Sequence, residues 1–146
     1  SMKNLPNETI AAPTPREPSD EEMLQVIADF LAMGYADNIV AMFRQEPRYW
    51  DWTGRLLTDE RYAVRLGVLV LFEQLVVLCP EKLPLAIPSL AAQLDNPVDW
   101  VRGEAVSVLG LIASDSALDL VRSRLDDRSP QVREIAHDIL GLPFHG

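Results

Sequence analysis

The sequence has few of the residues that build most chemical sites. Among its 146 residues there is one cysteine, Cys79, and there are two histidines, His137 and His145. A single cysteine excludes an internal disulfide and every zinc or iron–sulfur pattern that needs several cysteines. The two histidines have no His-x-x-His spacing, and we expect neither a metal nor another cofactor. Cys79 ends an apolar stretch and has no histidine or basic residue beside it, which predicts a buried, unreactive thiol.

The sequence motifs of common enzyme classes are also missing. There is no Gly-x-Gly-x-x-Gly, phosphate loop or Gly-x-Ser-x-Gly, and seven scattered glycines cannot form a phosphate cradle. Adjacent acids occur at 20–22, 59–60 and 126–127. Each group stands at an expected helix start, where capping and the helix dipole account for it. We therefore expect that the protein is not an enzyme.

Positive charge is scarce: the chain has 13 basic and 22 acidic side chains, which gives a formal net charge of -9. This charge repels phosphate backbones and anionic membranes at long range, so we expect neither a nucleic acid nor a membrane as partner. The most apolar stretch, 66–79, is too short to span a bilayer and contains Glu73 and Gln74. With no secretory signal pattern and no disulfide, these features indicate a cytoplasmic protein.

What the sequence does contain is helical periodicity interrupted by short breakers, with no convincing strand pattern. Residues 1–18 include four prolines, and we expect a flexible N-terminal arm that begins with the remnant of an expression tag at Ser1. Ser19 and Glu22 have the spacing of a capping box, which predicts the start of one helical domain at 19–146. The eight expected helices lie at about 20–33, 36–45, 48–57, 60–78, 83–94, 98–113, 116–125 and 129–141.

Three segments of the chain repeat one pattern without gaps. They are Leu57–Arg65, Leu94–Arg102 and Leu125–Arg133, and each begins with leucine and ends with Val-Arg. The arginines lie 37 and then 31 positions apart, within the repeat lengths of stacked helix pairs. One helix pair cannot bury its apolar side alone, so neighbouring pairs must stack. The sequence therefore predicts an all-α fold, a right-handed α-solenoid of about four antiparallel helix pairs.

These residues resemble the HEAT repeat, an armadillo-like superhelix, and in particular its short bacterial form named after phycobilisome lyase subunits. The resemblance covers residues 57 to 141. In that family, a polar residue two places after the leucine caps the second helix and meets the arginine that follows. We also expect each arginine to bridge the turn of its own pair to the turn of a neighbour. The structural ladder implied by the resemblance pairs Asp59 with Arg65, Asn96 with Arg102, and Asp127 with Arg133.

Aromatic and arginine side chains gather between residues 44 and 65. This composition is typical of interface hot spots, and it equally suits a core that closes the end of the helix stack, so both interpretations stay open. Tyr49, Trp50 and Trp52 are the candidate contacts in this segment. If the segment is helical, Trp50 and Trp52 cannot both face inward easily. One of them should be partly exposed.

Trp100 is the best single candidate for a partner anchor. It stands where the other two copies have Ala63 and Gln131, and a position that accepts such residues should not be deep in a core. The leading hypothesis is a non-catalytic adaptor, scaffold or accessory subunit that binds another protein on the concave face of the solenoid. Its acidic charge favours a partner with a basic or mixed patch, and we expect a monomer or weak homo-oligomer. The further candidate contacts on that face are Arg102, Glu104, Glu134, His137 and Asp138.

Two alternative functions follow from the resemblance. HEAT-like stacks occur in DNA glycosylases that act on alkylated bases, and Asp99–Arg102 is similar to their Trp-Val-Arg segment, in which case the aromatic and arginine cluster would hold DNA. The net charge argues against this alternative. A lyase or chaperone subunit for a bilin chromophore follows only from the name of the repeat family, which is a weak basis for a function.

Overall fold

The computed structural model describes residues 16–146, which form eight α-helices, two 3-10 helices and no strand. The prediction of an all-helical fold is confirmed for this part of the chain. Of the predicted arm at 1–18, residues 1–15 lie outside the described residues. The elements are α2 (Asp20–Ala32), α3 (Ala36–Gln45), η1 (Pro47–Trp52), α4 (Thr53–Leu56), α5 (Tyr62–Leu78), η2 (Pro80–Ala86), α6 (Ile87–Gln93), α7 (Asp99–Ile112), α8 (Asp115–Arg122) and α9 (Pro130–Ile139).

The start of α2 is fixed by the predicted capping box. The Ser19 hydroxyl accepts a hydrogen bond from the Glu22 N–H at 3.1 Å, and the Glu22 carboxylate accepts one from the Ser19 N–H at 2.9 Å. Two main-chain donors that the helix cannot satisfy are thereby satisfied by side chains. The helix ends before Gly34, which has a φ of +87° and is the left-handed terminator that the sequence predicts.

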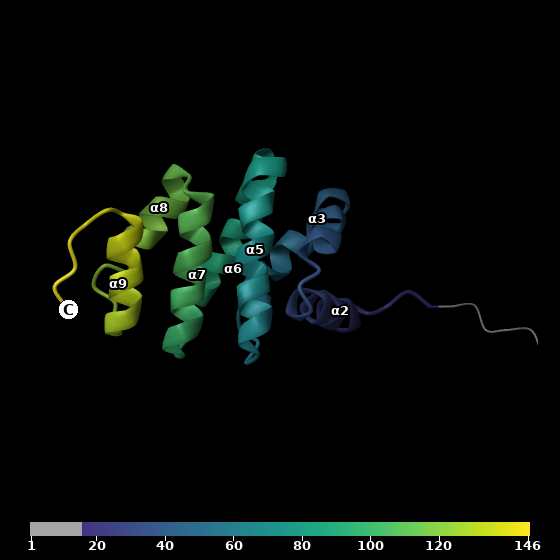
Figure 1. The fold of residues 1–146 in the computed structure, drawn as a ribbon, viewed down its shortest axis with the longest axis horizontal. Coiled ribbons are helices and arrows are strands. Elements are labelled where there is room, and N and C mark those ends of the chain that lie inside the picture. Colours follow the sequence, from purple (N-terminus) through teal and green to yellow (C-terminus); the bar gives the residue numbers. More distant parts are fainter. Residues whose placement is uncertain (1–15) are drawn as a thin grey trace, which may run out of the picture.

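Three long helices lie side by side in a row, in the order α5, α7 and α9 (Figure 1). Helices α6 and α8 lie behind this row, and α2 and α3 pack against α5 on the side away from α7 (Figure 1). Helices α7 and α9 approach closely because α7 carries glycine where they meet. A Cβ atom at Gly110 would lie 2.5 Å from the Ile139 Cδ1 atom, which is closer than such atoms approach. Gly110 therefore permits the close packing of Ile139 of α9 against α7.

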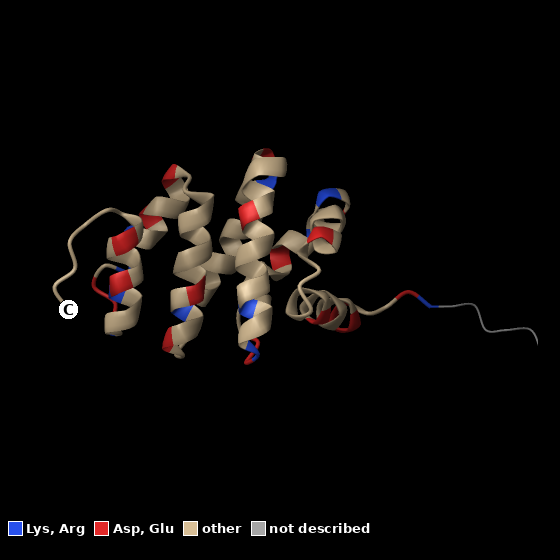
Figure 2. Cartoon of the chain, in the orientation of Figure 1, with Lys and Arg blue, Asp and Glu red and all other residues tan. Residues whose placement is uncertain are grey.

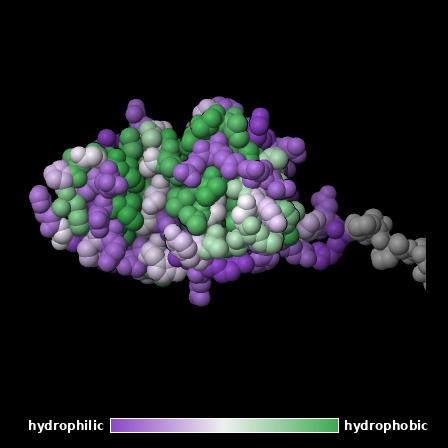
Figure 3. Space-filling view, in the orientation of Figure 1, coloured by the Kyte–Doolittle hydropathy of each residue, from purple (hydrophilic) through white to green (hydrophobic). Residues whose placement is uncertain are grey.

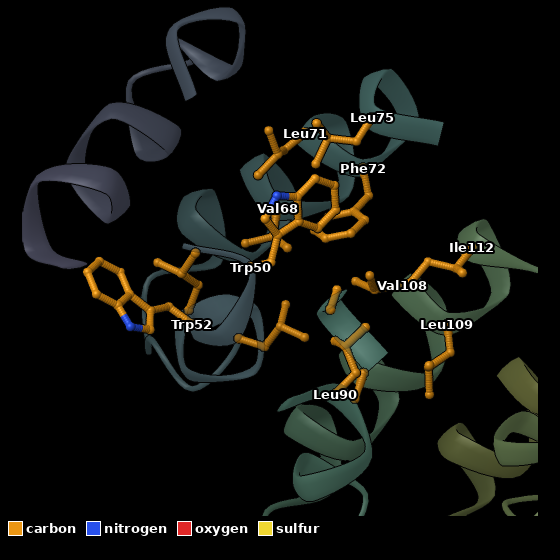
Figure 4. Packing of buried hydrophobic residues seen from close by; sticks show 14 of the residues in the cluster. Trp50, Trp52, Val68, Leu71, Phe72, Leu75, Leu90, Val108, Leu109 and Ile112 are labelled. Atoms are coloured by element: carbon orange, nitrogen blue, oxygen red, sulfur yellow. The ribbon is translucent and has the colours of Figure 1, made fainter. Parts of the chain in front are cut away.

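One continuous apolar core joins the helices from α2 to α9. Helix α5 contributes Val68, Leu71, Phe72 and Leu75, all fully buried, and these side chains meet Trp50 in the centre of the cluster (Figure 4). The sequence predicts that α5 is covered on several sides, and it does pack against α2, α3, α4, α7 and η2. One side of α5 nevertheless remains exposed, with Tyr62, Leu66, Val70 and Val77 on it.

The prediction of a single α-helix at 48–57 is wrong. The segment forms the 3-10 helix η1 followed by the short α-helix α4. Residues three apart are eclipsed in a 3-10 helix, so Tyr49 and Trp52 share one side, with ring centroids 5.1 Å apart. Trp50 points to another side, where its Nε1 donates to the Phe43 carbonyl oxygen at 2.9 Å and its ring meets Phe72.

The two tryptophans of this segment are both buried. Trp50 is 0% exposed and Trp52 is 8% exposed, so the expectation that one of them would be partly exposed is wrong. Figure 4 shows their rings on different sides of the same segment, as the threefold periodicity of η1 requires. With Tyr49 also buried, all three aromatic side chains are core residues. Their side chains are packed inside the core and are not exposed for contact with a partner.

Candidate functional site

The three repeated arginines make the same main-chain contact. In each copy, the arginine Nη1 atom donates a hydrogen bond to the carbonyl oxygen six residues earlier. The members of each predicted pair are therefore neighbours, but their contact involves a main-chain oxygen and not a side-chain carboxylate. The distances are 3.0 Å from Arg65 to Asp59, 2.9 Å from Arg102 to Asn96, and 2.9 Å from Arg133 to Asp127.

The side chain of the polar residue in each pair holds the turn that leads into the second helix. Its oxygen accepts a hydrogen bond from the main-chain N–H two residues later. Asparagine serves as well as aspartate in this role, because the turn needs only an acceptor oxygen. The three copies are therefore equivalent in local structure. The acceptor and donor residues are Asp59 and Arg61, Asn96 and Val98, and Asp127 and Ser129, each at 2.9 Å.

A buried ion pair links α7 to the turn before α9. We refer to the contact between two neighbouring helices of the row as a joint. Arg102 binds the Asp127 carboxylate with both Nε and Nη2, at 2.9 and 2.8 Å, and each side chain is 1% exposed. This bond confirms that an arginine of one copy bridges to the turn of the next. Burial raises the pKa of Asp127, but hydrogen bonds from Arg102 and the Ser129 N–H outweigh it and hold that pKa below its ordinary value.

The buried pair changes the expected role of Arg102. The sequence predicts this residue both in the ladder and on the partner-binding face. All three of its guanidinium nitrogens are engaged inside the protein, because Nη1 donates to the carbonyl oxygens of Asn96 and Pro97 while the other two bind Asp127. Arg102 is thus a structural residue, and its assignment as a partner contact is wrong.

The joint between α5 and α7 is closed differently. Asn96 stands where the next copy has Asp127, and it offers no carboxylate. The Arg65 Nε binds Glu104 of α7 instead, at 2.9 Å, with the two side chains 12% and 16% exposed. The Arg65 guanidinium also lies over the ring of Trp100, with its Cζ atom 4.2 Å from the ring centroid. This joint therefore reaches the surface, and Trp100 is the side chain that covers it.

Trp100 is 38% exposed and forms a wall of a hollow of about 340 Å³. The hollow crosses all three helices of the row, and its lining is mainly apolar, with Tyr62 from α5 and Val132 and Ile135 from α9. A second hollow of about 440 Å³ begins at the same Ile135 and continues toward Leu142. Figure 3 shows hydrophobic surface between the near helices of the row. We refer to the two hollows together as the groove.

The border of the groove is acidic. Glu134 and Asp138 line the second hollow and are exposed one helical turn apart on α9, and Asp99 lines the first hollow. Within residues 16–146, none of these three carboxylates forms an ion pair. The one arginine in the groove, Arg65, is neutralised by Glu104. Figure 2 shows the acidic positions on α7 and α9. The groove therefore combines apolar walls with uncompensated negative charge.

The structure brings together some of the predicted contacts and separates others. Trp100, Glu134 and Asp138 lie along the groove. His137 lies beside it, with its Nδ1 2.7 Å from the Arg133 carbonyl oxygen and its ring against Phe144. Sequence reasoning missed the apolar wall residues Val132, Ile135 and Leu142. A helical wheel of α9 would have placed Ile135 next to the face that carries the two acids.

Four other features of the described residues concern metal sites, unsatisfied polar groups, a reactive thiol and membrane-spanning helices. In residues 16–146, no three His, Cys, Asp or Glu side chains lie close enough together to hold a metal ion. Every buried side-chain nitrogen and oxygen atom in this part has a hydrogen-bond partner. Cys79 is buried, as predicted, and burial raises the pKa of its thiol. No helix among these residues has the length and apolar character needed to cross a membrane.

Comparison with known proteins adds no family to this description. No protein-family model matches the chain, and neither a curated protein nor a solved structure matches it. The resemblance to the HEAT repeat consequently stays a prediction.

Proposed function

We propose that this protein is a non-catalytic protein–protein interaction module, a right-handed α-solenoid of HEAT-like helix pairs that binds a partner protein in the groove. The observation that carries the proposal is the placement of Trp100. Its ring is held in position by the Arg65 guanidinium, is partly exposed, and borders an open apolar hollow. Tryptophan is one of the residues enriched at the energetic hot spots of protein interfaces.

The repeated hydrogen bonds support the solenoid part of the proposal. Three successive copies share the arginine-to-carbonyl contact and the turn held by an aspartate or asparagine oxygen. Each second helix, α5, α7 and α9, packs against its neighbour in the row. Stacked helix pairs of this kind create extended surfaces that are wide enough to hold another polypeptide.

The exposed side of α5 supports the binding part of the proposal. Tyr62, Leu66 and Val70 follow each other at four-residue intervals and are all exposed, so an apolar stripe runs along α5 from the groove. Together with Trp100 and Ile135, this stripe forms a contiguous surface that a partner would remove from water. Clustered apolar surface of this type marks interaction sites.

The DNA-binding alternative depends on the Asp99–Arg102 segment, and two residues of this segment are not accessible to DNA. In the Asp99–Arg102 segment, Val101 and Arg102 are buried, and the Arg102 guanidinium is bound to Asp127. An arginine held in this way cannot contact a phosphate without breaking a buried ion pair. The acidic border of the groove would also repel a nucleic acid.

Affinity purification of the full chain from its native source tests the proposal. Three baits are compared: the unchanged protein, Trp100→Ala, and Tyr35→Ala as a matched control, since Tyr35 is an exposed aromatic residue at the distant α2–α3 turn. We expect the unchanged protein and Tyr35→Ala to recover the same partner and Trp100→Ala to lose it. Circular dichroism checks that all three are folded. Equal recovery by all three baits would contradict the proposal.

A further inference from the structure

We infer that the groove binds a basic segment of another protein, in which an aliphatic side chain enters the hollow beside Trp100 while two cationic side chains pair with Glu134 and Asp138. This inference rests on the proposed function and specifies the chemistry of the partner.

The aliphatic requirement comes from the walls of the first hollow. Val132 and Ile135 form one side and the Trp100 ring forms another, and Gly103 lets Ile135 and Val132 pack closely against α7. Of the charged residues that line this hollow, Arg65 and Glu104 neutralise each other and Asp99 lies at its border. A charged side chain buried between Val132, Ile135 and Trp100 would lose its water, whereas an aliphatic one gains by burial.

The cationic requirement comes from the second hollow. Glu134 and Asp138 are one helical turn apart and line it together with Leu142. Their side chains are thus on the same face of α9, with Cβ atoms about 6 Å apart, a spacing that two basic side chains of one segment can reach together. A cation there contacts carboxylates with no other ionic partner in residues 16–146.

The two hollows place these requirements next to each other. Ile135 lines both of them, so the position for the aliphatic side chain and the position for the cations are adjacent along α9. One short segment can therefore fill both. Anionic ligands such as nucleic acid or acidic lipid headgroups are repelled by the same carboxylates.

A second copy of this chain is a poor source of the cations. Most arginines of the helical part are already bound to acids of their own chain, so they would have to break an ion pair before they could serve a neighbour. The net charge of -9 also makes two copies repel each other. The arginines paired in this way are Arg16, Arg48, Arg55, Arg61, Arg65, Arg102, Arg122 and Arg124.

Binding of designed peptides to the full chain tests the inference. The probe is a fluorescein-labelled amphipathic peptide of leucine and lysine, followed by fluorescence anisotropy. Two comparison peptides keep its length: in one every leucine is replaced by serine, and in the other every lysine is replaced by glutamate. We expect the leucine–lysine peptide to bind at least tenfold more tightly than either comparison peptide. Equally tight binding of the serine–lysine peptide would overturn the aliphatic requirement.

Charge-reversal variants locate the binding site. Glu134→Lys/Asp138→Lys is compared with Asp37→Lys/Asp51→Lys, which changes the net charge equally at exposed acids of α3 and η1 that form no ion pair in residues 16–146. We expect the first variant to bind the leucine–lysine peptide at least tenfold more weakly and the second to bind it like the unchanged protein at moderate salt. Equal weakening by both variants would mean diffuse attraction to an acidic protein and would overturn the inference.

The two proposals can fail separately. If Trp100→Ala loses a cellular partner while peptide binding is indifferent to Glu134→Lys/Asp138→Lys, the groove is an interaction site but its partner is not a basic segment. If Trp100→Ala affects neither the cellular partner nor the peptide, the proposed function fails and this inference fails with it.

Discussion

Replacing Asp127 with asparagine would leave the Arg102 guanidinium buried without its counterion. The asparagine oxygen can still accept the Ser129 N–H, so the turn before α9 keeps its hydrogen bond. The amide nitrogen, however, would replace a carboxylate oxygen that now accepts a hydrogen bond from Arg102. Two donors, the amide and the guanidinium, would then face each other. Because both side chains are 1% exposed, water cannot replace the lost carboxylate. Removing one member of such a pair costs about 3 to 5 kcal/mol of folding free energy.

Urea unfolding followed by far-ultraviolet circular dichroism measures this cost. The matched control is Asp119→Asn, because Asp119 pairs with Arg122 at the surface, with side chains 75% and 55% exposed. An exposed pair contributes about 0 to 1 kcal/mol, so the control should unfold close to the unchanged protein. A domain of this kind is stable by about 5 to 15 kcal/mol, so the Asp127→Asn chain should fold with a much lower urea midpoint.

A double substitution separates the pair from the individual side chains. In Arg102→Met/Asp127→Leu both charges are gone, and no charge is left buried without a partner. We expect this variant to lose less stability than the sum of the losses of Arg102→Met and Asp127→Leu. If Asp127→Asn costs no more than Asp119→Asn, or if the double variant costs the full sum, the reasoning about the α7–α9 joint is refuted.

The same pair predicts a dependence on pH. The native pKa of Asp127 is lowered, so its ionised form stabilises the fold above the unfolded pKa, which is about 3.9. That contribution is lost as the pH falls through the lower, native pKa. The stability difference between the unchanged protein and Asp127→Asn should therefore stay constant at neutral pH and shrink only in acid. A difference that disappears between about pH 8 and 6 would contradict this assignment.

Three other substitutions or reactions test the fold. A Cβ at Gly67 would lie 2.7 Å from the Leu31 carbonyl oxygen, so Gly67→Ala should lose about 1 to 3 kcal/mol in urea unfolding, and a gain would contradict the packing of α2 on α5. Ser19→Ala should cost about 1 kcal/mol, measured by thermal unfolding, because it removes the capping box with Glu22. Cys79 should react with a thiol reagent far more slowly in the native protein than in denaturant, and equal rates would show that its thiol is accessible.

Most helix positions could be predicted because their ends have local signals. Ser19 and Glu22 set the start of α2, Gly34 sets its end, and Ser129 with Pro130 sets the start of α9. The predicted helix at 36–45 has the same bounds as α3. These signals act within one turn of the chain, so they can be read without knowledge of the tertiary structure.

Two segments were predicted as single α-helices and are not. The apolar spacing of Tyr49 and Trp52 fits a repeat of three residues as well as one of 3.6, so periodicity alone cannot distinguish η1 from an α-helix. In the predicted helix at 83–94, Pro84 removes a main-chain donor, and the chain forms η2 before α6 begins at Ile87.

The candidate site was predictable only where its contacts are local. Each arginine and the carbonyl oxygen it binds are six residues apart, and the repeated pattern places them together. The acids bound across the joints are 39 residues from Arg65 and 25 residues from Arg102, and nothing in their spacing marks them. Arginine is also rarely buried, which is why Arg102 was assigned to the surface as well as to the ladder.

The unequal closure of the two joints has a mechanical consequence. Separating α7 from α9 would break the Arg102–Asp127 pair, whose charges are buried away from water. Separating α5 from α7 would break the Arg65–Glu104 pair, whose charges are near the surface and can be hydrated. We therefore expect the row to open first between α5 and α7. Such an opening would separate Arg65 from Glu104 directly beneath the indole of Trp100.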